Sequence, residues 1–243
     1  MARVVKEQEH AVKRKDILDT AQRLVYTKGY EGMSIQDILN DLSISKGAFY
    51  HYYASKQALL EALIVRMVDE AEPIISPIVH DPQLSALEKV HGMFDASARW
   101  KTARKDYLLA LMQGWYADEN VLVREKALAG MIKHFAPMLA DIIRQGLAEG
   151  VMNTRFPDQM AEMAFALLVN MGDTYMDLLF DNSPGPTGLQ RAIDLVDAYN
   201  DALERMLGTA TGSLHLVDRA ILEDWFGPSD TVISGNGHEQ LNP

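Results

Sequence analysis

Apolar residues along this chain return every three or four positions, and this spacing predicts amphipathic α-helices. From residue 83 onward the pattern fills long segments separated by Gly, Asn, Asp and Pro, and no useful length alternates as a strand would. The helices expected here are 83–102, 104–117, 119–149, 157–181, 187–208 and 213–226. Pro137 predicts a kink or break near 133–135, because proline lacks the N–H of a helix interior. The pattern therefore predicts an all-α protein.

The N-terminal part of the chain has the same helical period. A first long helix is expected at 7–28, with Gly29 closing it as a left-handed cap. Another helix, opened by Ser55, should end at the Glu72-Pro73 step, since proline cannot donate the hydrogen bond that continues a helix. This helix would connect the N-terminal region to the rest of the chain.

Residues 34–56, SIQDILNDLSISKGAFYHYYASK, predict two short helices joined by a tight turn, followed by the start of a third. Ser34 and Asp37 have the spacing of a capping box at the first helix. Ser45 is placed to cap the second helix, and Ser55 the third. This order of elements is typical of a helix-turn-helix motif.

The second short helix is rich in aromatic residues, since four of the five positions 49–53 are Phe or Tyr. On a helical turn Phe49 shares one face with Tyr53. Lys46 shares another face with Tyr50, so one pair can enter the core while the other points outward. An outward Lys, Tyr hydroxyls, a His and a Gly suit contacts to phosphates and base edges. The alternative is a helical turn with surplus surface aromatics.

Residues 17–64 resemble, without gaps, the DNA-binding domain of the TetR (tetracycline repressor) family. The matching elements are Ile17-Leu18-x-x-Ala21, Gly29-Tyr30, the Ser34 cap, Ser45-Lys46-Gly47, Tyr50-His51-Tyr52 and Ser55-Lys56-x-x-Leu59-Leu60. Ala48 departs from the usual Thr. Leu42-Ser43 replaces the usual Ala-Gly of the turn, where Ser accepts a positive φ less readily than Gly. The resemblance implies DNA contacts from Ser34, Gln36, Ser45, Lys46, Gly47, Ala48, Tyr50, His51, Tyr52 and Lys56.

The charge is divided unevenly along the 243 residues. The net charge is −11, yet basic residues outnumber acidic ones up to residue 57, so the acidic excess belongs entirely to the remainder. Residues 1–57 thus form a mildly basic head, and the residues after them form an acidic body. This division concentrates attraction for DNA at one end of the protein. Acidic bodies are common, so the charge division supports the motif without establishing it.

Other classes of protein find little support. The chain has no cysteine, which excludes disulfides, thiolate metal sites and a Cys nucleophile. Its seven histidines include no i, i+4 pair for a helical metal site, and no phosphate-binding Gly loop or G-x-S-x-G motif occurs. No enzyme, cofactor or metal is therefore predicted. No apolar run is long enough to span a bilayer and the N-terminus lacks a signal-peptide core, so we expect a cytoplasmic protein without a membrane partner.

Two segments are too apolar for the surface of a monomer. Residues 160–171 are apolar on nearly all sides, and 187–208 has a second broad apolar stripe. In the TetR family the two penultimate long helices pack against their copies. The resemblance therefore implies a homodimer through 157–181 and 187–208, which would bind a palindromic operator in double-stranded DNA. A large monomeric core is the alternative.

The body is also rich in Met and aromatic residues, which suit a cavity for a small apolar or aromatic effector. The candidates are Trp100, Tyr107, Met112, Trp115, Tyr116, Phe135, Met138, Met171 and Tyr175. Asn170, Asp173 and Asp177 are polar insertions in an otherwise apolar helix, suited to a ligand or to an interface. Such a stripe is also typical of an ordinary helical core.

These observations predict a DNA-binding domain at 1–56, a ligand-binding and dimerisation domain at 57–227 and a flexible polar tail at 228–243. The expected function is a ligand-responsive transcriptional regulator that acts as a repressor. The alternative is a small-molecule-binding or scaffold protein that retains the helix-turn-helix only as a packing unit.

Overall fold

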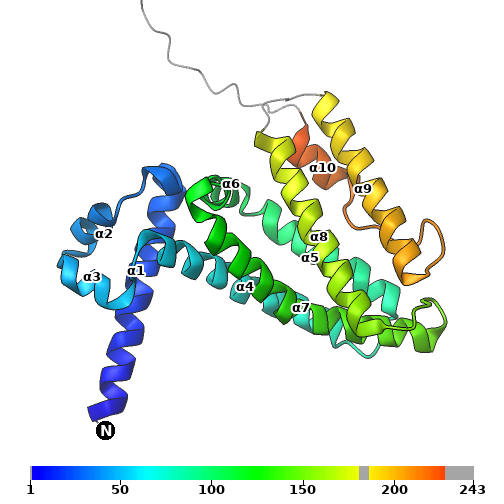
Figure 1. Cartoon of the computed structure of the whole chain (residues 1–243), viewed down its shortest axis with the longest axis horizontal. Coiled ribbons are helices and arrows are strands. Elements are labelled where there is room, and N and C mark those ends of the chain that lie inside the picture. The colour runs from blue at the N-terminus through cyan, green and yellow to red at the C-terminus, as the bar shows by residue number, and fades with distance from the viewer. Residues whose placement is uncertain (1, 181–185, 228–243) are drawn as a thin grey trace, which may run out of the picture.

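Figure 1 shows the fold in a computed structural model that describes residues 2–180 and 186–227. In these two ranges the chain forms ten α-helices, one short 3-10 helix and no strand, which confirms the all-α prediction. The helices are α1 (Ala2–Gly32), α2 (Ile35–Leu42), α3 (Lys46–Tyr52), α4 (Lys56–Val79), α5 (Ala86–Thr102), α6 (Lys105–Trp115), α7 (Val121–Glu149), α8 (Pro157–Phe180), α9 (Pro186–Leu207) and α10 (Arg219–Phe226), with the 3-10 helix η1 at Asp118–Asn120. The polar tail predicted at 228–243 lies outside the described residues.

The first helix is longer at both ends than the predicted 7–28. Gly29 interrupts it with φ 73° and ψ 164°. The positive φ that was expected is present, but the ψ differs from a left-handed cap, so the helix kinks and continues for most of a turn. Glycine adopts this backbone without a Cβ clash. Beyond the kink Tyr30 and Met33 enter the core, where both are fully buried.

Prolines do not end the helices in which they lie. α4 passes through Pro73 and Pro77, so the end predicted before Pro73 is wrong. Both prolines are exposed and four residues apart on one face, where water can bind the carbonyls left without an N–H partner. The other face is held by Ile75 and Val79 in the core of the body. α7 likewise runs unbroken across Pro137, so of the predicted kink or break the break is absent, and the kink stays a prediction.

The last helix, α10, begins at Arg219 rather than at residue 213. The preceding segment finds hydrogen-bond acceptors on α9 instead of within a helix. The Glu204 carboxylate accepts from the backbone N–H groups of Gly212 and Leu214, at 2.9 Å each. Asn200 Oδ1 accepts from Leu216 N at 3.2 Å. The chain therefore stays irregular until Asp218, whose backbone carbonyl accepts the first hydrogen bonds of the short helix.

Two large hydrophobic cores and a smaller cluster between α9 and α10 hold the described part of the chain together. The N-terminal core, formed by α1–α4 with α6 and residues of α7 at its edge, includes Ile17, Val25, Tyr30, Ile38, Phe49, Tyr53, Leu59, Leu63, Leu111 and Trp115. The body core joins the end of α4 to α5, α7, α8 and α9. In Figure 1 α4 runs from the small helices α2 and α3 into the body. The N-terminal core includes residues beyond 56, such as Leu59 and Leu63. The domain boundary predicted after residue 56 stays a prediction.

No helix among residues 2–180 and 186–227 is long and apolar enough to cross a membrane.

Candidate nucleic-acid interface

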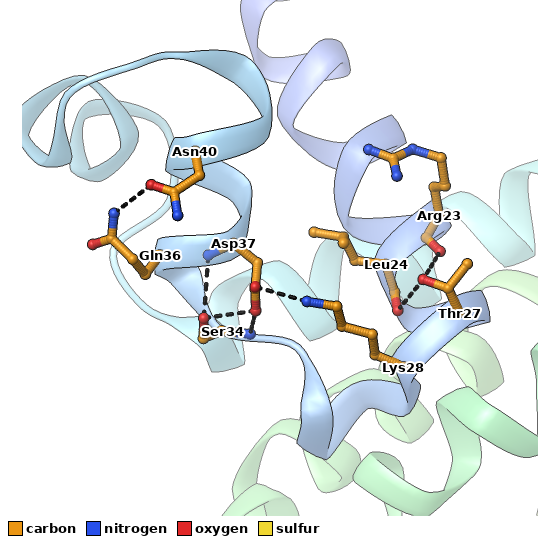
Figure 2. A network of polar contacts seen from close by, with 8 residues as sticks. All are labelled: Arg23, Leu24, Thr27, Lys28, Ser34, Gln36, Asp37 and Asn40. Carbon is orange, nitrogen blue, oxygen red and sulfur yellow. Dashed lines mark hydrogen bonds and ion pairs between the residues drawn. The ribbon is translucent and has the colours of Figure 1, made fainter.

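The first helix of the motif, α2, begins at the predicted capping box (Figure 2). Ser34 Oγ accepts from Asp37 N at 3.1 Å, and Asp37 Oδ2 accepts from Ser34 N at 2.8 Å. Lys28 of α1 donates to Asp37 Oδ1 at 2.8 Å, which ties α2 to α1. The pKa of Asp37 is held far below its ordinary value, first by the Lys28 hydrogen bond and then by those from Ser34. The Ser34 hydroxyl is thus part of the cap, while Gln36 bonds Asn40 one turn along.

The turn between α2 and α3 is made without glycine. Ser43 takes the left-handed conformation, with φ 51° and ψ 43°, and its N–H donates to Asn40 O at 3.3 Å. Ile44 N then donates to Leu39 O at 3.1 Å. Ser therefore performs the role that glycine usually has in this turn, at a conformational cost.

The helix α3 separates its aromatic residues between core and surface, as predicted. Ser45 caps it by accepting from Ala48 N at 3.1 Å. Phe49 and Tyr53 are buried in the N-terminal core. Tyr50 is 43% exposed on the opposite face. The Lys46 ammonium lies 5.9 Å from the centroid of its ring. A cationic and aromatic face is therefore open to a partner.

The ten predicted DNA-contact residues lie together at the start of α2, along α3 and at the start of α4. Those with exposed side chains or backbone are Ser34, Gln36, Ser45, Lys46, Gly47, Tyr50 and His51, whereas Ala48, Tyr52 and Lys56 are half-buried. Ser55 caps α4 by accepting from Ala58 N at 3.0 Å, which fixes the position of Lys56. Contact of each with DNA stays a prediction.

One neighbour of this surface was missed by the sequence reasoning. His10 of α1 packs against α3, with its ring centroid 4.6 Å from that of Tyr52 and 5.4 Å from that of His51. Because His10 precedes the start of the motif at Ser34 by 24 residues, no local spacing in the sequence indicates this contact. The surface around α3 therefore includes the exposed residues 8–16 of α1.

The nine candidate ligand residues are distributed over both cores rather than around a single cavity. Tyr107, Met112, Trp115 and Tyr116 belong to the N-terminal core, whereas Met138, Met171 and Tyr175 belong to the body core. Phe135 stacks on Phe165 with centroids 5.7 Å apart, and the Trp100 Nε1 atom is buried without a hydrogen-bond partner. Their role as ligand contacts stays a prediction.

A polar link connects two of these regions. The Tyr116 hydroxyl donates to Asp173 Oδ1 of α8 at 2.5 Å. Burial, reinforced by this contact with Asp173, raises the pKa of Tyr116 above its ordinary value. The Tyr175 hydroxyl is buried without a hydrogen-bond partner among the described residues.

A cavity of about 220 Å³ lies elsewhere, between α9, the irregular segment and α10. It is lined by Ile193, Val196, Asp197, Asn200, His215, Val217, Asp218, Arg219 and Leu222. None of the nine candidates lines it. In the described part of the chain no three His, Cys, Asp or Glu side chains are grouped to hold a metal ion.

The helices α1, α2 and α3, with serine caps on α2 and α3 and an exposed face on α3, are typical of helix-turn-helix DNA-binding proteins. The family model described as bacterial regulatory proteins of the tetR family matches residues 17–63. A second, described as a tetracyclin repressor-like C-terminal domain, matches residues 113–181. The chain belongs to the TetR family.

Its relatives are transcriptional regulators. The chain is 29% identical over 140 residues to the regulator EthR of Mycolicibacterium smegmatis, covering 51% of this chain and 64% of that protein. It is 22% identical over 183 residues to the repressor KstR2 of Mycobacterium tuberculosis, covering 74% and 86%. The chain spans less than two thirds of the length of several curated relatives that it matches.

A solved TetR-family regulator from Pectobacterium atrosepticum has the same fold. Its TM-score is 0.59 at 18% identity, and the match covers 82% of this chain and 96% of that one. This likeness concerns the fold alone.

Proposed function

We propose that the protein is a transcriptional repressor that binds a palindromic operator as a homodimer and is released from it by a small apolar or aromatic effector. The observation that supports this most is the outward face of α3, where Lys46 and Tyr50 are exposed beside a fully capped α2. A helix-turn-helix kept only as a packing unit would have no reason to leave that face open. The scaffold alternative is therefore the weaker proposal.

Within this proposal Tyr50 contacts a base edge and Lys56 a phosphate. Replacement of Tyr50 by Ala should weaken operator binding and relax preference at one base position, at a cost of roughly 1–3 kcal/mol. Replacement of Lys56 by Gln should weaken binding to all sequences alike and reduce the slope of log K against log[salt] by about 0.9 for each protomer. Tyr26→Ala is the matched control, since Tyr26 is 59% exposed on α1 and is not a predicted contact.

Titration of fluorescent duplexes at several salt concentrations tests these assignments. The proposal expects a large loss for Tyr50→Ala on operator and a small one on random DNA. Equal losses for Tyr50→Ala and Tyr26→Ala would contradict the role of α3.

The proposed dimer uses the outward faces of α8 and α9. On α8 Met163 is 52% exposed and Ala166 is exposed one turn later, so an apolar patch is open there. The apolar stripe of α9 lies mostly inside the protomer, where Val196 packs with Leu222 and Phe226. A self-complementary contact centred on α8 would present two copies of α3 to one face of DNA, about 34–36 Å apart.

The proposed release acts through the tilt of α4. The first half of α4 lies in the N-terminal core and its end lies in the body core, so the two regions share one rigid rod. An effector that fits between body helices only when α4 is tilted would stabilise the wrong spacing of the two α3 helices. Linkage then requires operator DNA to lower effector affinity by the same factor, typically about 5–150-fold. Compounds that stabilise the protein against heat without lowering operator affinity would contradict this mechanism.

A further inference from the structure

The aromatic ring of Tyr30 lies where α1, α4 and α6 meet. Tyr30 is fully buried, and its hydroxyl donates to Lys56 O at 3.3 Å. The Lys56 ammonium lies 4.4 Å from the centroid of the same ring and donates to Glu31 O at 3.3 Å. One side chain therefore fixes both the backbone and the ammonium group of the first residue of α4.

The same ring is in direct contact with α6. At Gly114 an added Cβ would lie 2.0 Å from Tyr30 Cδ1 and 2.8 Å from Tyr30 Cβ, so only glycine leaves room for the ring. Asn120, which is fully buried, donates to Gly114 O at 2.8 Å and holds the α6 backbone at this point. The Tyr30 ring and the α6 backbone are already closely packed, with no gap between them. A displacement of α6 toward α1 must therefore move the ring.

We propose that Tyr30 is a positioning residue through which α6 controls the phosphate contact of Lys56. The inference rests on the proposed function and deepens it, because it gives a movement of α6 a route to Lys56 that bypasses the tilt of α4. When Tyr30 is displaced, the Lys56 ammonium loses the cation–π contact that orients it, and the Lys56 carbonyl loses its bond from the Tyr30 hydroxyl. The ammonium then spreads over many rotamers, and its contribution to phosphate binding falls.

A double-mutant cycle between Gly114→Ala and Lys56→Gln tests this route. In the wild-type background Gly114→Ala should reduce affinity for any duplex by about fivefold per protomer at about 0.15 M salt, the contribution of one phosphate contact. It should also reduce the salt slope by about 0.9 per protomer. In the Lys56→Gln background the same substitution should change affinity by less than roughly twofold, because the contact it acts through is already gone.

Gly130→Ala in α7 is the matched control, since nothing lies within 4 Å of the added Cβ. It should leave affinity and slope unchanged. Tyr30→Phe serves where Gly114→Ala fails to fold, because it keeps the ring and removes only the bond to Lys56 O. Its effect should be smaller and should also vanish in the Lys56→Gln background. Circular dichroism establishes that each variant is folded.

If Gly114→Ala reduces DNA affinity as much in the Lys56→Gln background as in the wild type, the role proposed for Tyr30 is overturned. Phosphate contacts are independent of sequence, so the cycle is measured on a random duplex as well as on the DNA flanking the protein's own coding region. A wild type that does not prefer the flanking DNA would overturn the proposed function, while the cycle on the random duplex still decides the role of Tyr30.

Discussion

Replacement of Ser43 by Gly should stabilise the protein, because Ser43 is the only non-glycine residue with a positive φ among residues 2–180 and 186–227. The left-handed conformation costs an L-residue about 1–2 kcal/mol. Glycine avoids that cost but loses about 0.5–1 kcal/mol more conformational entropy on folding. The Ser43 side chain is exposed and makes no hydrogen bond in the described structure, so its removal costs nothing further. The net expectation is a stabilisation of about 0.5–1 kcal/mol.

Urea unfolding of the full chain measures this difference. Of the three tryptophans, Trp115 lies in the same core as the helix-turn-helix, so its share of the fluorescence reports on the unfolding of that region. With an m-value of about 2 kcal/mol/M, the midpoint should rise by roughly 0.25–0.5 M. Operator affinity should stay unchanged, because Ser43 is not a predicted contact.

Ser45→Gly is the matched control two residues away. Ser45 has a φ of −75° and its hydroxyl caps α3, so glycine there should lower stability by a few tenths of a kcal/mol. If Ser43→Gly lowers the midpoint or leaves it where it was, the conformational argument is wrong.

Three further predictions concern assembly, acid and the α9 carboxylate. Met163→Glu should convert the dimer to monomers in sedimentation, because a charge buried on a two-fold axis is unpaired in both copies; Val65→Glu, at a similarly exposed site on α4, should not. Asp37→Asn should lower the urea midpoint at neutral pH. Since the pKa of Asp37 is depressed in the folded state, its contribution is present above the ordinary value of 3.8 and is lost as pH falls below it, so the difference from wild type should shrink in acid. Glu204→Gln should lower the melting temperature by an amount equivalent to about 1–3 kcal/mol, because one of the two N–H groups bound by the carboxylate loses its acceptor; an undiminished melting temperature would contradict this role.

The local features of the head follow from the sequence because their causes lie within one turn of helix. The Ser34 cap depends on Asp37 three residues later, and the division of α3 between core and surface depends on a spacing of four. Such contacts are fixed by the backbone geometry of the helix itself. The helix-turn-helix and the open face of Tyr50 were therefore predictable.

The features that sequence reasoning missed depend on partners distant in the chain. α4 continues through Pro73 because that residue faces solvent and the opposite face packs in the body core. The segment before α10 is irregular because Glu204 supplies its acceptors. Trp115 shares a core with the head rather than with Met171, and composition alone cannot tell which of two cores an apolar residue joins. The contact of Tyr30 with Gly114 likewise joins positions far apart in the sequence.

The most direct test of the proposed function is a titration of the full chain onto two duplexes of equal length and composition. One is taken from the DNA that flanks its own coding region, and the other is a scrambled copy. At about 0.15 M salt a specific regulator should bind the first at least 10³-fold more tightly, with an even number of protomers per duplex and with a steep salt dependence for both. Equal affinity for every flanking duplex and its scrambled copy would contradict the assignment.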